Sequence, residues 1–159
     1  MSEFRSTRRQ FLAGSARLAA GAGLVSIVVV EPCRATPEAL QGAIAEIIGE
    51  APLRQGRVTL DLPSLVENGN AVPLTVTVES PMSEADHVTA IHVFNEKNPQ
   101  PYVLTARLGP RAGRARIATR IKLADAQRVV AIAAMSDGSF WSASADVIVT
   151  IAACVEGLQ

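Results

Sequence analysis

Cys154 is the residue whose type and position most directly suggest chemistry. It stands five residues before the C-terminal Gln159. A position so close to a chain end is poorly suited to burial, and a thiol there can be presented to other proteins as a nucleophile. The alternative is a small apolar residue that ends the last strand, since free cysteines are often buried. The position favours the reactive thiol.

Two histidines raise a second hypothesis, a blue-copper site. Such a site needs two histidines, one cysteine and often a methionine on a β-sandwich, and the chain offers His87, His92 and Cys154. Histidines five residues apart in one strand point to opposite faces, and no histidine follows Cys154 to complete the usual ligand loop. Structural or surface histidines are therefore favoured, and we expect neither a metal nor another cofactor.

A row of basic residues alternates along one predicted strand. Arg114, Arg116, Arg120 and Lys122 share one face, while apolar residues take the other. The row could attract an anion or an acidic partner. A solvated strand face is the favoured interpretation, because charged residues are common on exposed strands.

The composition argues against nucleic-acid binding, and the lack of catalytic motifs argues against a self-sufficient enzyme. The 159 residues include 15 Lys and Arg against 15 Asp and Glu, with 4% aromatics, whereas neutralising phosphates needs a basic excess. The sequence has no glycine-rich phosphate loop and no metal-ligand spacing. No histidine or aspartate clearly pairs with Cys154.

The N-terminal 35 residues have the pattern of a cleaved export signal. Thr7-Arg8-Arg9-Gln10-Phe11-Leu12 fits the twin-arginine motif, and a weakly apolar run leads to a small residue at Ala35. Arg17 interrupts the run and Glu31-Pro32 closes it, which disfavours stable membrane insertion. We predict a signal peptide over residues 1–35 and a periplasmic mature protein.

Removal of this segment changes both charge and cysteine content. It holds five of the 15 basic and two of the 15 acidic residues, so ten and thirteen remain, a net charge of −3. It also removes Cys33 and leaves Cys154 as the one thiol of the mature chain. An unpaired thiol is unusual in an oxidising compartment, which strengthens the functional interpretation of Cys154.

The mature chain is predicted to begin with a short amphipathic helix. Thr36 suits the N-cap, Pro37 the first helical position and Glu38 the first turn, and Gly49 suits the C-terminal end. Apolar residues recur at helical spacing between them, so the helix needs a partner surface. These residues are Leu40, Ala43, Ile44, Ile47 and Ile48.

From residue 57 onward an apolar period of two indicates strands, separated by turns such as Glu67–Asn70 and Asp137-Gly138. Tyr102 is expected in an inner row with Leu104, Ala106 and Leu108. About seven short strands predict an all-β, immunoglobulin-like antiparallel β-sandwich. With the helix it forms one domain over residues 36–151, followed by a tail over 152–159. The expected strands are 57–61, 74–79, 88–94, 102–108, 114–123, 129–135 and 141–151.

Several short segments in fixed order carry a family resemblance. They are Asp61-Leu62-Pro63, Glu67-Asn68-Gly69-Asn70-Ala71-Val72-Pro73, Glu79-Ser80-Pro81-Met82, Glu84-Ala85-Asp86-His87-Val88, Ile91-His92-Val93-Phe94, Glu96-Lys97-Asn98-Pro99, Ser136-Asp137-Gly138-Ser139 and Val149-Thr150-Ile151. Together they resemble SoxY, the sulfur-carrier subunit of bacterial thiosulfate oxidation. The resemblance spans essentially the whole mature chain, and a twin-arginine leader is also typical of the family.

The resemblance implies a partner, a mechanism and a role for Cys154. The partner is a second small β-protein, SoxZ, for which the strand 88–94 and the apolar helix face are candidate contacts. A haem enzyme couples the carrier thiol oxidatively to thiosulfate, and a dimanganese hydrolase then releases sulfate. A molybdenum–haem enzyme acts on the remaining sulfane sulfur. Cys154 falls where the family's carrier cysteine falls, and the carrier itself is no enzyme.

The C-terminal residues depart from the family pattern. The family typically ends Gly-Gly-Cys-Gly-Gly, whereas this chain ends Ala152-Ala153-Cys154-Val155-Glu156-Gly157-Leu158-Gln159. Alanine restricts an arm that glycine would leave free, and bulk and charge follow the thiol. The alternative is therefore a divergent β-sandwich whose cysteine is inert or only forms a disulfide-linked homodimer.

Overall fold

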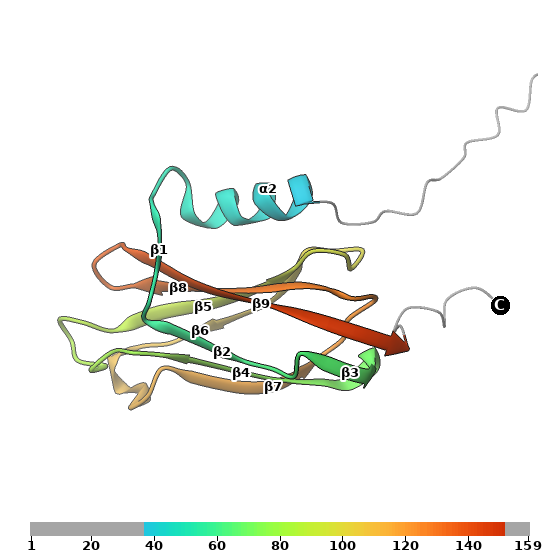
Figure 1. The fold of residues 1–159 in the computed structure, drawn as a ribbon. Helices are drawn as coiled ribbons and strands as arrows, with labels where there is room; N and C mark the ends of the chain where they lie inside the picture. The colour runs from blue at the N-terminus through green and yellow to red at the C-terminus, as the bar shows by residue number, and fades with distance from the viewer. Residues whose placement is uncertain (1–36, 152–159) are drawn as a thin grey trace, which may run out of the picture. The chain divides into compact units, whose positions relative to one another are not determined.

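The computed structural model describes residues 37–151, which form two packed β-sheets with a helix outside them (Figure 1). An all-β sandwich with a short N-terminal helix was the sequence prediction, and it is confirmed. One sheet has the order β1 (Leu53–Gln55), β9 (Phe140–Ile151), β8 (Gln127–Met135), β5 (Val88–Asn95), β6 (Tyr102–Arg107), and β3 (Leu65–Asn68) also pairs with β9. The other has the order β2 (Val58–Asp61), β4 (Val72–Val78), β7 (Arg116–Ile121).

The core lies between the two sheets and follows the apolar alternation of the strands. In β4, Leu74 and Val76 are buried and face the core, while Thr77 is exposed on the outer face. Each such aliphatic side chain contributes roughly 1.5–3 kcal/mol on full burial. The same cluster includes Ile91 and Val93 of β5 and Val147 of β9, so both sheets supply it.

The helix α2 (Pro37–Ile48) covers the outer face of the larger sheet, as Figure 1 shows. Its buried residues Leu40 and Ile44 pack in a second cluster with Phe94, Val130 and Ile132. Gly49 ends the helix with a φ of 61° and donates its N–H to the Ala45 carbonyl oxygen at 2.8 Å. The left-handed φ is one that glycine adopts without a steric penalty.

The double-sided apolar pattern of β5 is explained within the chain. Ile91 and Val93 face the inner core, and Phe94 lies on the outer face under α2. β5 also lies between β8 and β6. The expectation that this strand and the apolar helix face are open for a partner is therefore wrong, because each of them covers the other.

Two short strands were not predicted. β1 and β3 pair with β9 in parallel, while β2, which lies between them in the chain, belongs to the other sheet. The turn was predicted over 67–70, but in the structure it begins later. β3 continues through Asn68, and the 3-10 helix η2 (Gly69–Ala71) follows. A second 3-10 turn, η3 (Pro110–Ala112), precedes β7.

The predicted inner position of Tyr102 is also wrong. The register between β5 and β6 shifts at Val93/Phe94, so that Tyr102 lies beside Phe94 instead of continuing the row of Leu104. Its ring meets the Phe94 ring edge-on, with the ring centroids 5.5 Å apart, and its side chain is 44% exposed. A β-bulge of this kind inserts one residue and re-aims the next side chain.

Candidate functional site

Cys154 lies outside the described residues, so the candidate site is built from the end of the strand that precedes it. Antiparallel pairing of β9 with β8 reaches Val147, and β9 then runs on to Ile151 beside β3. Figure 1 shows this end of β9 next to β3. The last four residues of β9 are therefore positioned by β3.

Side-chain and backbone bonds hold this part of β9. Ile148 donates its N–H to the Ser64 carbonyl oxygen at 2.8 Å. The Thr150 hydroxyl lies 3.1 Å from the Glu67 carbonyl oxygen and 3.5 Å from that of Val66. Thr150 thus joins β3 to the strand that leads to Cys154, and both acceptors are backbone carbonyl oxygens of β3.

The corner after β3 is itself fixed. The Asn68 carboxamide oxygen accepts the N–H of Asn70 at 2.8 Å and caps η2, as an Asx turn does. The Gly69 carbonyl oxygen accepts the N–H of Leu123, also at 2.8 Å. Residues 67–70 carried part of the family resemblance. Through Gly69 they bond the corner after β3 to the loop between β7 and β8, which contains Leu123.

Asn98 organises the neighbouring loops. Its carboxamide nitrogen donates to the Lys122 carbonyl oxygen at 2.8 Å, and its oxygen accepts from the Ala124 N–H at 2.9 Å and from the Gln127 side chain at 2.8 Å. Gln127 in turn accepts the N–H of Lys97 at 2.8 Å. We call this region, residues 64–71, 96–99 and 122–127 with the last residues of β9, the tail end of the sandwich.

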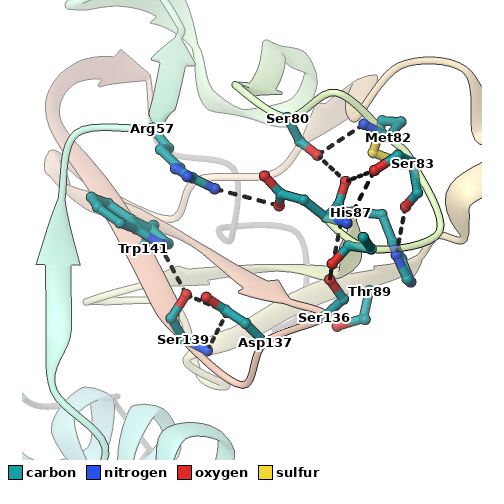
Figure 2. A network of polar contacts seen from close by, with 12 residues as sticks. Arg57, Ser80, Met82, Ser83, His87, Thr89, Ser136, Asp137, Ser139 and Trp141 are labelled. Carbon is teal, nitrogen blue, oxygen red and sulfur yellow. Dashed lines mark hydrogen bonds and ion pairs between the residues drawn. The ribbon is translucent and has the colours of Figure 1, made fainter.

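The remaining motifs gather at the opposite end, which Figure 2 shows. We call it the loop end: the loop 79–87 and the turn 136–139. The Ser136 hydroxyl accepts the N–H of His87 at 3.1 Å and donates to the Ala85 carbonyl oxygen at 3.3 Å. Met82 has a φ of 50°, and its N–H bonds to the Ser80 hydroxyl at 3.1 Å.

Trp141 closes the loop end over the core. Its indole N–H donates to the Ser139 hydroxyl at 3.2 Å (Figure 2). The guanidinium carbons of Arg54 and Arg57 lie 5.8 and 5.3 Å from its ring centroid, within cation–π range. The Ser139 hydroxyl and backbone N–H lower the pKa of Asp137, with a smaller effect of the two arginines. The Asp137 carboxylate is therefore a weaker base than an ordinary aspartate.

The two histidines have separate partners and do not form a common site. The Nδ1 of His87 lies 3.0 Å from the Ser83 carbonyl oxygen, and that of His92 lies 2.6 Å from the Thr105 hydroxyl. Burial, and secondarily the charge of Arg107, lower the pKa of His92. Within residues 37–151 no group of three or more potential metal-ligating side chains is found.

The predicted basic row lies on the uncovered outer face of the smaller sheet. Arg114, Arg116, Arg120 and Lys122 are all exposed, and within residues 37–151 none of them is in an ion pair. A hollow of about 610 Å³ on this face is lined by Arg120, Thr75 and Asp61 among others. The solvated-face interpretation fits this placement.

Two exposed apolar side chains lie at the tail end. Leu65 is 59% and Ile148 58% exposed, and the two residues are direct neighbours across the β3–β9 pair. Sequence periodicity could not single them out, because Leu65 precedes a segment predicted as a turn. In the described part of the chain, no helix is long and apolar enough to cross a membrane.

Comparisons with known proteins agree with this geometry. The family described as "Sulfur oxidation protein SoxY" matches residues 44–154. The sulfur carrier protein SoxY from Chlorobium limicola f thiosulfatophilum is 28% identical, with a TM-score of 0.61 over 72% of this chain and 98% of that chain. A superoxide reductase (neelaredoxin) from Ignicoccus hospitalis shares the fold, with 17% identity and a TM-score of 0.54 over 72% and 94%. No curated protein matches the chain.

Proposed function

Because the chain belongs to the SoxY family, we propose that it carries sulfur intermediates of thiosulfate oxidation covalently on Cys154. SoxY proteins are typically non-catalytic sulfur carriers, generally periplasmic, that work with SoxZ and the Sox enzymes. The observation that carries the proposal is the family match itself, which runs from residue 44 to Cys154. The last described strand ends three residues before this thiol.

This reaction sequence requires only one chemical group of this chain, a nucleophilic sulfur. The thiol and thiosulfate form one S–S bond, giving a cysteine S-thiosulfonate, one proton and two electrons, which a haem enzyme accepts. Hydrolysis at a dimanganese enzyme then breaks the bond between the sulfane sulfur and the sulfonate sulfur. Water supplies the oxygen of sulfate, and a persulfide stays on Cys154. A molybdenum–haem enzyme is the expected oxidant of that persulfide.

The fixed end of β9 supports presentation of the thiol at one end of the sandwich. Three residues span at most about 11 Å, so Cys154 stays within that distance of Ile151. Phe140, at the loop end of β9, is eleven residues from Ile151, which corresponds to about 36 Å of strand. The thiol of one chain therefore cannot meet its own loop end. Partner enzymes are expected to approach the tail end.

The proposal includes export and processing. The twin-arginine motif at residues 7–12 and the small residue Ala35 support a signal peptide over 1–35, a carrier domain over 36–151 and a carrier tail over 152–159. Residues 1–36 lie outside the described structure. Intact-mass measurement of the exported protein is expected to give a chain that begins near Thr36, and a chain that begins near Met1 contradicts the proposal.

The experiment that tests the carrier role is mass spectrometry of the mature protein with a SoxZ-like subunit, thiosulfate and the loading haem enzyme. We expect adducts on Cys154 that a reductant removes, and none on Cys154→Ser. A Cys154→Ser strain is expected to lose thiosulfate-dependent respiration. Growth of that strain at the wild-type rate would falsify the carrier role and favour an inert or disulfide-forming cysteine. Ser83→Ala, at the loop end, is the matched control and should load normally.

A further inference from the structure

The outer face of the larger sheet is only partly covered by the helix. Phe94, Val130 and Ile132 lie under α2. Leu65 of β3 and Ile148 of β9 are direct neighbours in the parallel pair, lie outside that cluster and stay exposed. Of the four large apolar side chains that are exposed within residues 37–151, these two have the largest exposed fractions. Single exposed apolar residues are normal on a protein surface, but these two adjoin each other at one place.

The strand alternation fixes the direction of both side chains. The next residues along the two strands, Val66 and Val149, pack against the inner core and are themselves a pair. Successive side chains of a strand point to opposite faces of the sheet, so Leu65 and Ile148 point outward, side by side. Substitution of either of them therefore leaves the inner core unchanged.

We propose that the C-terminal segment of this chain, residues 155–158, folds back onto this outward pair, so that Val155 and Leu158 cover Leu65 and Ile148. Cys154 is then held close to the sheet, and its thiol is shielded until the segment leaves the pair. The contact itself does not depend on the carrier role. Its use, to control when the thiol is available to partner enzymes, rests on the proposed function.

The segment is long enough to reach the pair. Ile148 lies three residues before Ile151, about 10 Å along the strand. Four residues lead from Ile151 to Val155 and seven to Leu158, which span at most about 14 and 25 Å. Both side chains can therefore return to the pair after a turn.

The composition of the segment and its attachment also select it as the occupant. Val155 and Leu158 are apolar, whereas the glycine-rich arm typical of the family has no side chain for such a contact. Because the segment belongs to the same chain, its effective concentration at the pair is about 1 mM or more. This favours it over a separate molecule that is present at lower concentration.

The reactivity of the Cys154 thiol tests the contact, because the thiol reacts faster when the segment is released. The reduced mature protein is mixed with a dipyridyl disulfide, and the release of pyridinethione is followed. Ile148→Thr and Leu158→Ser should each raise the rate about three- to tenfold, as the docked fraction is lost. The combined variant should react no faster than the single ones, because both changes remove the same contact. Leu53→Thr, which changes an exposed apolar residue of β1, is the matched control and should react like the wild type.

Several results would overturn the proposal. One is a wild-type rate in Ile148→Thr or Leu158→Ser, and another is a combined variant in which the two effects multiply. Protection of the wild-type thiol that disappears on dilution would identify a second copy as the occupant, and protection that requires an added SoxZ-like subunit would identify that partner. Each variant should unfold cooperatively in urea, which excludes misfolding as the cause of a faster rate. No Sox enzyme takes part in the measurement, so its result does not depend on whether Cys154 carries sulfur.

Discussion

The tail end and the loop end of the sandwich are both tied by polar side chains, but by different means. At the tail end one carboxamide, Asn98, joins two loops through partly buried contacts, and β9 is bonded to β3. At the loop end, serine hydroxyls such as that of Ser136 bond loop backbone at exposed positions. The difference teaches that the less exposed network lies at the end of the sandwich where β9 leads to the thiol.

The largest effect is expected from moving the thiol between the two ends. In a Cys154→Ser background, Ser83→Cys places an exposed thiol in the loop 79–87, which is still held by the bond from the residue 83 N–H to the Asp86 carbonyl oxygen and by the bonds of the Ser80 hydroxyl. Such a loop cannot be threaded into an enzyme active site, so loading with thiosulfate should be lost. Val155→Cys in the same background keeps a thiol in the tail and should retain part of it. Intact mass after incubation with thiosulfate and the loading enzyme measures the adduct on each variant. Full loading of the thiol at position 83 would contradict the proposal that only the tail end presents a thiol to the enzymes.

The next effect concerns Asn98. Asn98→Ala leaves the Ala124 N–H without its partner and removes one of the two acceptors of the Gln127 amide. It should lower the free energy of unfolding by about 2–3 kcal/mol. Ser136→Ala, the loop-end counterpart, should cost only about 0.5–1 kcal/mol because water can replace an exposed bond. Urea denaturation of both variants measures the difference. Equal losses would show that the two networks are equally important.

A smaller loss is expected at Gly56, which lies against the Trp141 ring at the loop end. Its φ is 134°, and an added Cβ would lie 3.3 Å from the indole Cζ3. Gly56→Ala should therefore destabilise the fold by about 1–2 kcal/mol through backbone strain. Gly42 of α2 has nothing within 4 Å of an added Cβ, so Gly42→Ala should stabilise by about 0.5–1 kcal/mol. Thermal unfolding should show shifts of opposite sign.

The smallest effect is expected from His92, which lies between the two ends. Burial lowers its pKa in the folded state below the ordinary value of 6.5. The unfolded chain therefore binds more protons between the folded-state pKa and 6.5, so stability falls as the pH is lowered through this range. His92→Gln should flatten this part of the stability–pH curve. A slope as steep as in the wild type would exclude His92 as its source.

Sequence patterns predicted those elements whose own residues fix them. Alternation around Val76 in β4 and around Ile121 in β7 predicted these strands, and the proline and glycine at its ends predicted α2 within a residue. β1 and β3 were missed because they are three and four residues long, mostly exposed, and exist only by pairing with a strand some eighty residues later. The β-bulge that turns Tyr102 to the other face of the sheet likewise leaves no trace in the apolar periodicity of the sequence.

The site was predictable in a different way. Cys154 stands out by arithmetic alone, as the one cysteine left after the predicted cleavage, and its role stays a prediction because it lies beyond residue 151. The anchors of the preceding strand, Thr150 and residues 64–68, were not predicted. Their bonds join positions more than eighty residues apart, and spacing along a sequence cannot show such contacts.

The parallel pairing of β9 with β1 and β3 has a mechanical consequence. When a partner pulls on the tail, force acts along β9, whereas the hydrogen bonds run across the strand, perpendicular towards β8 and slanted towards β1 and β3. These bonds are then loaded together in shear instead of opening one after another. A pull on the C-terminus should therefore meet high resistance. The domain should stay folded while a partner enzyme pulls on its tail.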